Sequence, residues 1–133
     1  MSNGDFVHVE RVRFRDVDAM GHVNNAVFLT YLEQARVALF SERGGATGLG
    51  QMNMILARAE IDFRAPVRLG QEVEISVRAS RFGTKSFDLE YELRVEGELV
   101  AEAKSVQVAY DYDRREPIPV PTEWREKLAA VPA

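Results

Sequence analysis

The sequence predicts an α+β domain in which an antiparallel sheet of about five strands wraps around one long helix. Two observations lead to this fold class: one stretch of helical periodicity near the N-terminus, and a long series of segments that alternate apolar and polar residues after it. The connections between the alternating segments are short, which favours an antiparallel meander over parallel strands with crossovers. The amphipathic helix is then available to cover the apolar face of the sheet.

Length and composition point to one domain over residues 1–133, with 46% hydrophobic and 29% charged residues. A net charge of -4 gives no reason to expect a nucleic-acid partner. Because the chain has no cysteine and two histidines, disulfides, thiolate nucleophiles and thiolate-ligated metals are excluded, and we expect no metal site. The N-terminus carries no basic and apolar signal segment and no stretch approaches the roughly 20 apolar residues of a membrane span, so we expect a cytoplasmic protein with no membrane partner.

The helix is predicted over residues 26–42, a stretch without Gly or Pro. Asn24 or Asn25 suits the N-cap, and Gly44-Gly45 suits the stop. Four apolar side chains share one face at helical spacing, and this face should meet the sheet: Phe28, Leu32, Ala35 and Leu39.

Four segments alternate apolar with polar residues at a period of two, which is typical of strands packed on one face: residues 55–64, 73–79, 87–95 and 99–110. The last changes its apolar phase near Ser105, where we expect an irregularity. Residues 7–15 also suit a strand, but the phase moves from Val7 to Val12, which indicates a bulge or an irregular first half. Near the C-terminus Thr122 can cap a short helix that packs Trp124 onto the sheet.

The stretch most informative about function is Arg15-Asp-Val-Asp-Ala-Met-Gly-His-Val-Asn-Asn25, between the first strand and the helix. A helix N-terminus offers unpaired backbone N–H groups and a partial positive charge, which suits a carbonyl oxygen that gains negative charge. We expect Gly21 and its neighbours to supply these donors. Asp18 is the candidate base or nucleophile, and His22 could orient water or hold the substrate.

Each of these residues also has a structural interpretation. Asp18 could simply form a turn before the helix, and N-capping accounts for at least one of Asn24 and Asn25, which otherwise could bind polar substrate atoms. Glu33 is a second candidate carboxylate, although with Arg36 it could form only a helix-surface pair.

The motif from Phe14 to Asn25, followed by Tyr31-Leu-Glu-Gln-Ala-Arg36, resembles the signature of the 4-hydroxybenzoyl-CoA thioesterase family of hotdog proteins. This resemblance implies a hotdog fold, acyl-CoA as the substrate, no cofactor besides that coenzyme A, and a homodimer or homotetramer with active sites between subunits. It places the catalytic carboxylate on Asp18 and the backbone donor at the glycine that begins the helix, Gly21. The segment His22-Val-Asn-Asn25 resembles the branch of the family that acts on acyl-CoA and acyl-carrier-protein thioesters more than the branch that acts on aromatic thioesters.

The resemblance extends to Arg81-Phe-Gly-Thr-Lys85-Ser86, and implies that Arg81, Lys85 and Ser86 meet the nucleotide or pantetheine of coenzyme A. They could equally be solvated turn residues. Two other functions stay open: a non-catalytic acyl-CoA sensor or scaffold, and a hotdog hydratase, whose Asp and His are separated by five positions rather than by the four between Asp18 and His22. A free edge strand would make pairing with a second copy a natural completion of the sheet.

Overall fold

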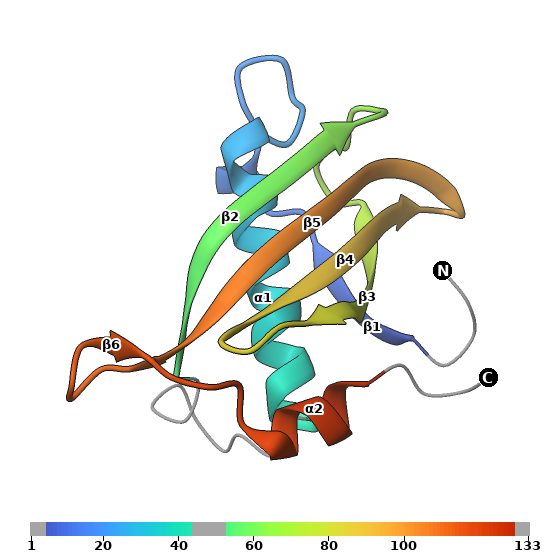
Figure 1. Ribbon diagram of the computed structural model, residues 1–133. Helices are drawn as coiled ribbons and strands as arrows, with labels where there is room; N and C mark the ends of the chain where they lie inside the picture. The colour runs from blue at the N-terminus through green and yellow to red at the C-terminus, as the bar shows by residue number, and fades with distance from the viewer. Residues whose placement is uncertain (1–4, 44–52, 130–133) are drawn as a thin grey trace.

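A computed structural model describes residues 5–43 and 53–129 of the protein and has the predicted α+β architecture (Figure 1). The strands are β1 (Phe6–Arg11), β2 (Met54–Phe63), β3 (Glu72–Phe82), β4 (Ser86–Val95), β5 (Glu98–Asp111) and the two-residue β6 (Glu116–Pro117). The helices are α1 (Asn25–Glu42), the 3₁₀ turn η1 (Phe14–Asp16) and α2 (Thr122–Leu128).

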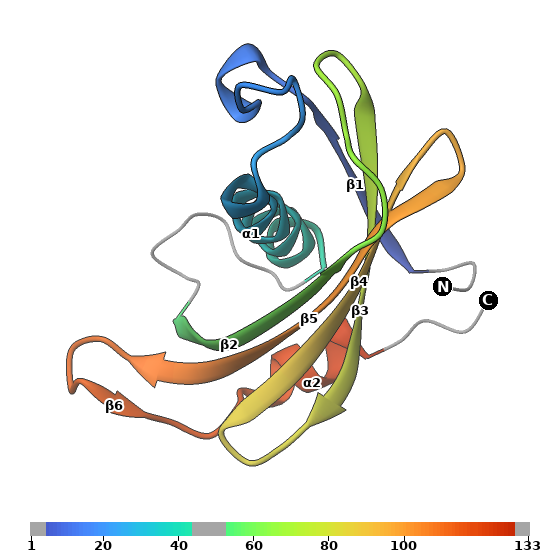
Figure 2. The same cartoon turned by 90° about the horizontal axis from the view of Figure 1, so that it is seen from above.

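The main strands form an antiparallel sheet in the order β1-β3-β4-β5-β2, with β6 attached to the end of β5. Seen from above, the strands curve around α1, which lies against the concave face (Figure 2). The hotdog fold expected from the sequence is therefore present. Its two edges are β1 and β2, and the latter follows α1 in the chain.

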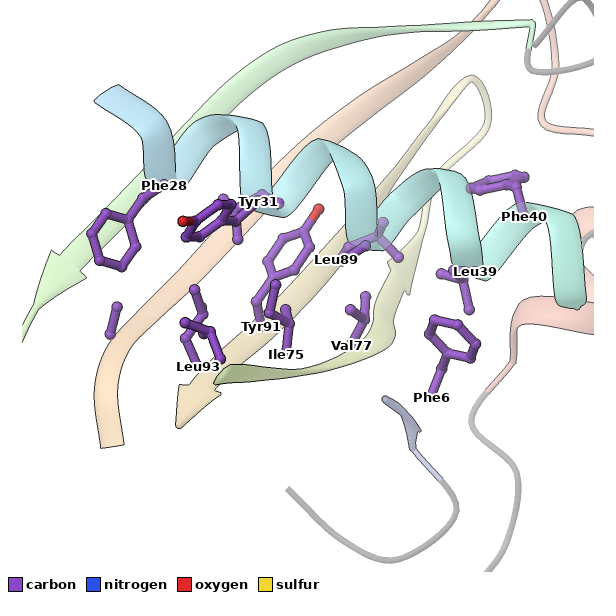
Figure 3. Packing of buried hydrophobic residues seen from close by; sticks show 14 of the residues in the cluster. Phe6, Phe28, Tyr31, Leu39, Phe40, Ile75, Val77, Leu89, Tyr91 and Leu93 are labelled. Atoms are coloured by element: carbon purple, nitrogen blue, oxygen red, sulfur yellow. The ribbon is translucent and has the colours of Figure 1, made fainter. Parts of the chain in front are cut away.

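The prediction for α1 is confirmed almost to the residue. Asn24 is the N-cap, and its Oδ1 accepts the backbone N–H of Ala26 at 2.9 Å. The helix ends at Glu42, so the predicted Gly44-Gly45 stop lies outside the described residues. All four residues of the predicted apolar face are buried, as are Tyr31 and Phe40. In Figure 3, Phe28, Tyr31 and Leu39 point from the helix toward the sheet.

The first strand is shorter than predicted. β1 ends at Arg11, and residues 14–16 form η1 instead of continuing the strand. Val12 is nevertheless buried, because its N–H donates to the carbonyl of Gln71, 2.9 Å away in the loop before β3. The buried positions keep one phase from Phe6 through Glu10 to Val12, whereas Val7 and Val9 are exposed. The apolar pattern therefore shifts because two valines face solvent, and not because of a bulge.

The predicted change of apolar phase within β5 near Ser105 is wrong, although the neighbouring strand β2 has an irregularity between Leu56 and Arg58, opposite Gln107 and Val106. β5 pairs with β4 without a break from Ala101 to Val108, so Ala101, Ala103, Ser105 and Gln107 share the face that meets α1. Ser105 and Gln107 are completely buried. The apolar pattern changed because polar residues occupy core positions, and not because the strand changes face.

Trp124 closes the lower end of the core, as predicted. Its ring meets the edge of Phe40 at a centroid distance of 5.1 Å and that of Phe87 at 5.9 Å. The short α2 thereby joins the C-terminal end of α1 to β4.

The predicted surface pair of Glu33 with Arg36 is not formed. Glu33 is exposed, whereas Arg36 is 8% exposed and directs its guanidinium into the core, where Nη1 donates to the hydroxyl of Tyr91 at 3.2 Å. An i, i+3 spacing permits a pair on the helix surface, but the position of Arg36 beside Leu32 turns its side chain inward.

Candidate active site

The loop before α1 is organised by a tight turn at Asp18. The N–H of Gly21 donates to the carbonyl of Asp18 at 3.0 Å, and the N–H of Asp18 donates to the carbonyl of His22 at 2.8 Å. Gly21 has a φ of 79°, a left-handed conformation that side chains disfavour. The glycine in the motif is therefore required by the turn itself.

The Asp18 carboxylate is held by the same turn. Its Oδ1 accepts the N–H of Met20 at 2.9 Å and the N–H of His22 at 3.2 Å. Within residues 5–43 and 53–129, no hydrogen bond engages Oδ2. One oxygen thus fixes the orientation of the half-buried group, and the other is available for chemistry.

Backbone hydrogen bonds fasten this loop to the segment between β2 and β3 and to η1. The N–H of Val23 donates to the carbonyl of Val67 at 2.7 Å, and the N–H of Asn24 donates to that of Asp16 at 2.9 Å. His22 also forms an isolated antiparallel bridge with Arg68. The start of α1 and the Asp18 turn are therefore placed relative to each other by several contacts.

Asp16, which sequence reasoning left without a role, braces the loop. It is 6% exposed, and its Oδ2 accepts the N–H of Arg13 at 2.9 Å and the hydroxyl of Tyr31 at 2.8 Å. Burial of the phenol, and then the hydrogen bond to Asp16, raise the pKa of Tyr31. The available sequence signal was its place three residues after Arg13, because a carboxylate at the third residue of a helical turn can accept the N–H of the capping residue.

The expectation that Gly21 begins the helix is wrong. α1 begins at Asn25, four residues later, and the Gly21 N–H is engaged by the Asp18 carbonyl. In the first turn of α1, Ala26 donates to the side chain of Asn24 and Val27 to its carbonyl, whereas the N–H of Asn25 has no partner among the described residues. Asn25 therefore offers the free donor at the positive end of the helix.

A pocket of about 440 Å³ opens at this helix end. The loop and helix line it with Asp18, His22, Asn24, Asn25 and Phe28, and the segment over residues 63–67 forms the opposite wall. The carboxylate and the start of α1 therefore share one cavity, with the aromatic rings of Phe28 and Phe63 meeting edge to face at 5.1 Å.

Arg81, Lys85 and Ser86 do not reach this pocket within one chain. Phe63 at the pocket pairs with Ala101, whereas Ser86 pairs with Val108, seven residues further along β5, or about 23 Å in a strand. The β3–β4 hairpin, which carries these three residues, and the pocket therefore lie at opposite ends of the sheet.

The hairpin arginine has partners of its own. Arg81 donates to Ser86 at 2.9 Å and to the buried Asp88 at 2.8 Å, and the second bond holds the pKa of the Asp88 carboxyl below its usual range. Lys85 is exposed.

Two features are absent from residues 5–43 and 53–129. These ranges contain no group of three or more His, Asp or Glu side chains placed to hold a metal ion. Neither helix in the same ranges has the length and apolar character needed to cross a bilayer.

The curved antiparallel sheet, the central helix and the carboxylate beside its N-terminus define a protein of the hotdog class. Residues 12–128 match the model of the thioesterase-like superfamily, so the chain belongs to that family.

Several relatives are similar over nearly their whole length. A 1,4-dihydroxy-2-naphthoyl-CoA hydrolase of Synechococcus elongatus is 26% identical over 93% of this chain and 95% of its own. The long-chain acyl-CoA thioesterase FadM of Escherichia coli is 29% identical over 89% of this chain and 92% of its own. A thioesterase of Thermus thermophilus, solved in complex with coenzyme A and Zn, is 37% identical with a TM-score of 0.86 over 96% of this chain and 94% of its own.

Proposed function

We propose that the protein is an acyl-CoA thioesterase, which hydrolyses an acyl-CoA or acyl-carrier-protein thioester to a free acid and a thiol. One observation carries this proposal: the Asp18 carboxylate and the first turn of α1 line the same pocket. A base and an anion-stabilising donor facing one cavity are the two elements that acyl transfer to water requires. The relatives named above have activities of this class.

The thioester carbonyl binds with its oxygen toward the N–H of Asn25. The helix dipole and this donor stabilise the negative charge that develops on the oxygen, and a donor of this kind contributes about 2.7–4 kcal/mol to transition-state stabilisation. Asn25 takes the place that the sequence assigned to Gly21, because the Gly21 N–H is engaged within the turn. Gly21 supports the site by allowing the turn that orients Asp18.

Asp18 acts as the general base through its free oxygen. Water loses a proton to Oδ2 while its oxygen attacks the carbonyl carbon, and the tetrahedral intermediate then expels the thiolate, which takes up the proton. A second route has the carboxylate attack directly and release the thiolate, after which water hydrolyses the acyl–aspartyl anhydride. Both routes use Asp18 and produce the same acid and thiol.

The other pocket residues support binding. His22, half-buried in the pocket, orients the water or the thioester sulfur. Asn24 serves mainly as the N-cap, and the exposed side chain of Asn25 binds polar atoms of the substrate. The reaction calls for no cofactor besides the coenzyme A of the substrate, and we retain the expectation of a cytoplasmic location.

We further propose a homodimer, or a dimer of such dimers, formed through β2. This ten-residue edge strand is largely exposed, and it presents apolar side chains to solvent, including Leu56 at 45% and Phe63 at 46% exposure. An exposed apolar edge of this length favours pairing with a second copy. The pocket wall over residues 63–67 directly follows β2, so the partner would cover the pocket.

Such a dimer also gives Arg81, Lys85 and Ser86 a route to the substrate. Because they lie at the opposite end of the sheet from the pocket of their own chain, the proposed contact with coenzyme A is made in the site of another subunit. Lys85, which is exposed, would bind a phosphate there.

The deciding experiment measures thiol release from short, long and aromatic acyl-CoAs by the wild type, Asp18→Asn and the matched control Asp113→Asn, which changes an exposed aspartate. We expect turnover of at least one substrate and a loss of a few hundredfold or more in kcat/KM for Asp18→Asn alone. Equal rates in all three proteins would move the catalytic role to Glu33 or another group. Binding without turnover would favour the sensor, and hydration of an enoyl-CoA would favour the hydratase.

A further inference from the structure

The core contains a polar cluster that the proposed chemistry does not use. Its members come from three elements and are all at least nine-tenths buried: Arg36 of α1, Tyr91 of β4, and Ser105 and Gln107 of β5. Buried polar side chains of this kind cost folding free energy unless every donor and acceptor is paired. The presence of four such side chains in the core therefore calls for a functional or structural explanation.

The four side chains form one hydrogen-bonded chain. Arg36 Nη1 donates to the hydroxyl of Tyr91 at 3.2 Å, and that hydroxyl lies 2.5 Å from Ser105 Oγ. Gln107 Nε2 donates to the same Ser105 oxygen. Figure 3 shows Tyr91 directing its hydroxyl from the sheet toward α1, so the cluster lies between the helix and β5.

The cluster is incomplete at both ends. Gln107 Oε1 is fully buried and has no hydrogen-bond partner. At the other end, none of the salt bridges among residues 5–43 and 53–129 involves Arg36, so its buried positive charge faces no carboxylate there. An unmet acceptor and a guanidinium with N–H groups to spare mark a place where a ligand would complete the set.

The cluster is connected to the active site by one stripe of α1. Asn25, Leu29, Leu32 and Arg36 follow the spacing i, i+4, i+7 and i+11, which places them in line on one side of a helix. The stripe is about 16 Å long, and the Arg36 side chain leans back toward the N-terminus of the helix. An acyl group whose carbonyl lay at Asn25 and that followed this stripe would pass Leu29 and reach Arg36.

The facing strands carry small side chains along the same path. Ala101, Ala103 and Ser105 alternate on the face of β5 that meets α1, and Ala59 of β2 pairs directly with Ser105. Of these small residues Ala59 and Ala103 are partly exposed, whereas Ala101 and Ser105 are buried. A chain that ran away from the pocket beside the helix would therefore pass the side of this path toward β2.

We propose that the Arg36–Tyr91–Ser105–Gln107 cluster recognises a hydroxyl group at the far end of the acyl chain, so that the preferred substrates are hydroxyacyl thioesters. This inference rests on the proposed thioesterase function and adds the substrate class. A hydroxyl is both acceptor and donor: it takes an N–H of Arg36 and gives its hydrogen to Gln107 Oε1. A carboxylate would repel that amide oxygen, and a methyl end would leave it unpaired.

The test compares ω-hydroxyacyl-CoAs with unsubstituted acyl-CoAs of equal length, from hexanoyl to dodecanoyl. Thiol release gives the ratio of kcat/KM values for each pair, and calorimetry on Asp18→Asn gives the ratio of Kd values independently of turnover. The variants are Gln107→Leu and, should that protein fail to fold, Ser105→Ala. Gln34→Leu changes an exposed glutamine on α1 and serves as the matched control.

We expect the wild type and Gln34→Leu to prefer the hydroxylated member of one pair by about tenfold or more, and Gln107→Leu to lose this preference. Ratios near one at every length, both in the rates of the wild type and in the Kd values of Asp18→Asn, would overturn the inference. So would a preference that survives in both cluster variants. If no thioester is hydrolysed, the proposed function fails, and the Kd ratio still decides whether the cluster binds the hydroxyl.

Discussion

Two buried polar clusters lie on opposite flanks of α1, and they differ in completeness. On the flank toward β1, Oδ2 of Asp16 accepts the Arg13 N–H and the Tyr31 hydroxyl, and no fully buried side-chain atom of this set lacks a partner. On the flank toward β5, the cluster around Arg36 leaves Gln107 Oε1 unpaired. The two clusters are buried to a similar extent, but only the cluster around Arg36 contains a fully buried acceptor without a hydrogen-bond partner.

This difference distinguishes a structural role for the Asp16 cluster, called the brace below, from the binding role proposed for the Arg36 cluster. A satisfied buried cluster stabilises the fold and holds the Asp18 loop against the helix, because each of its members is paired in the protein alone. An unsatisfied one costs stability until a ligand supplies the missing partner. Variants on the two flanks should consequently affect stability in opposite directions.

The largest effect on stability is expected from Asp16→Ala. This change removes an acceptor shared by two donors and leaves the Tyr31 hydroxyl buried without a partner, so the free energy of unfolding should fall by about 3 kcal/mol. Urea denaturation measures this, with the exposed Asp113→Ala as control. If Asp16→Ala lost no more stability than the control, the Asp16 cluster would not stabilise the fold and the comparison would fail.

Tyr31→Phe should have a smaller effect of the same sign. It deletes one hydrogen bond to a carboxylate while keeping the ring in the core, which predicts a loss of about 2 kcal/mol. Tyr110→Phe, at a partly exposed position, is the matched control in the same denaturation assay. The result contradicts the brace if both variants unfold at the same urea concentration.

Arg36→Met should leave stability unchanged or raise it by about 1 kcal/mol, because it replaces a buried charge that has no carboxylate partner among the described residues with an apolar chain of similar length. Calorimetric melting can compare it with Arg78→Met, which changes an exposed arginine of β3. A decrease of more than about 2 kcal/mol would show that the Arg36 cluster stabilises the empty protein.

The smallest effect concerns pH. Burial and the Asp16 hydrogen bond raise the pKa of Tyr31 in the folded state above its value of 10.0 in the unfolded chain. The associated stability is therefore present below pH 10 and is lost as the pH rises from there toward the folded pKa. Between about pH 9 and pH 10.5, the wild type should lose somewhat less than about 1 kcal/mol more than Tyr31→Phe. Parallel pH profiles from urea titrations would contradict this.

Sequence reasoning located what depends on local pattern. The predicted limits of α1 were close to the observed ones because the cap is local: Asn24 accepts the N–H of Ala26, two residues away. The period-two pattern of the strands was recognised because the sheet has one buried face. The place of the pocket followed from the same local reasoning, because it opens where α1 begins.

The errors have different sources. The loop at Gln71 meets Val12 from a distant part of the chain, whereas the Gly21 N–H is engaged within its own turn by the Asp18 carbonyl, and among the described residues the N–H of Asn25 is left without a partner. Ser105 and Gln107 looked like a change of face, since a period-two pattern cannot distinguish a bulge from polar residues that remain in the core. Arg36 looked like a surface residue for the same reason.

The Asp18 turn has a consequence for the temperature dependence of catalysis. Two backbone N–H groups grip Oδ1, so the carboxylate loses its rotational freedom when the loop folds and not when the substrate arrives. Preorganisation of this kind removes an entropic contribution from the activation barrier of the chemical step. If Asp18 has the proposed role, what is left of that barrier is mainly the enthalpy of bond making and breaking, whether the carboxylate acts as base or as nucleophile.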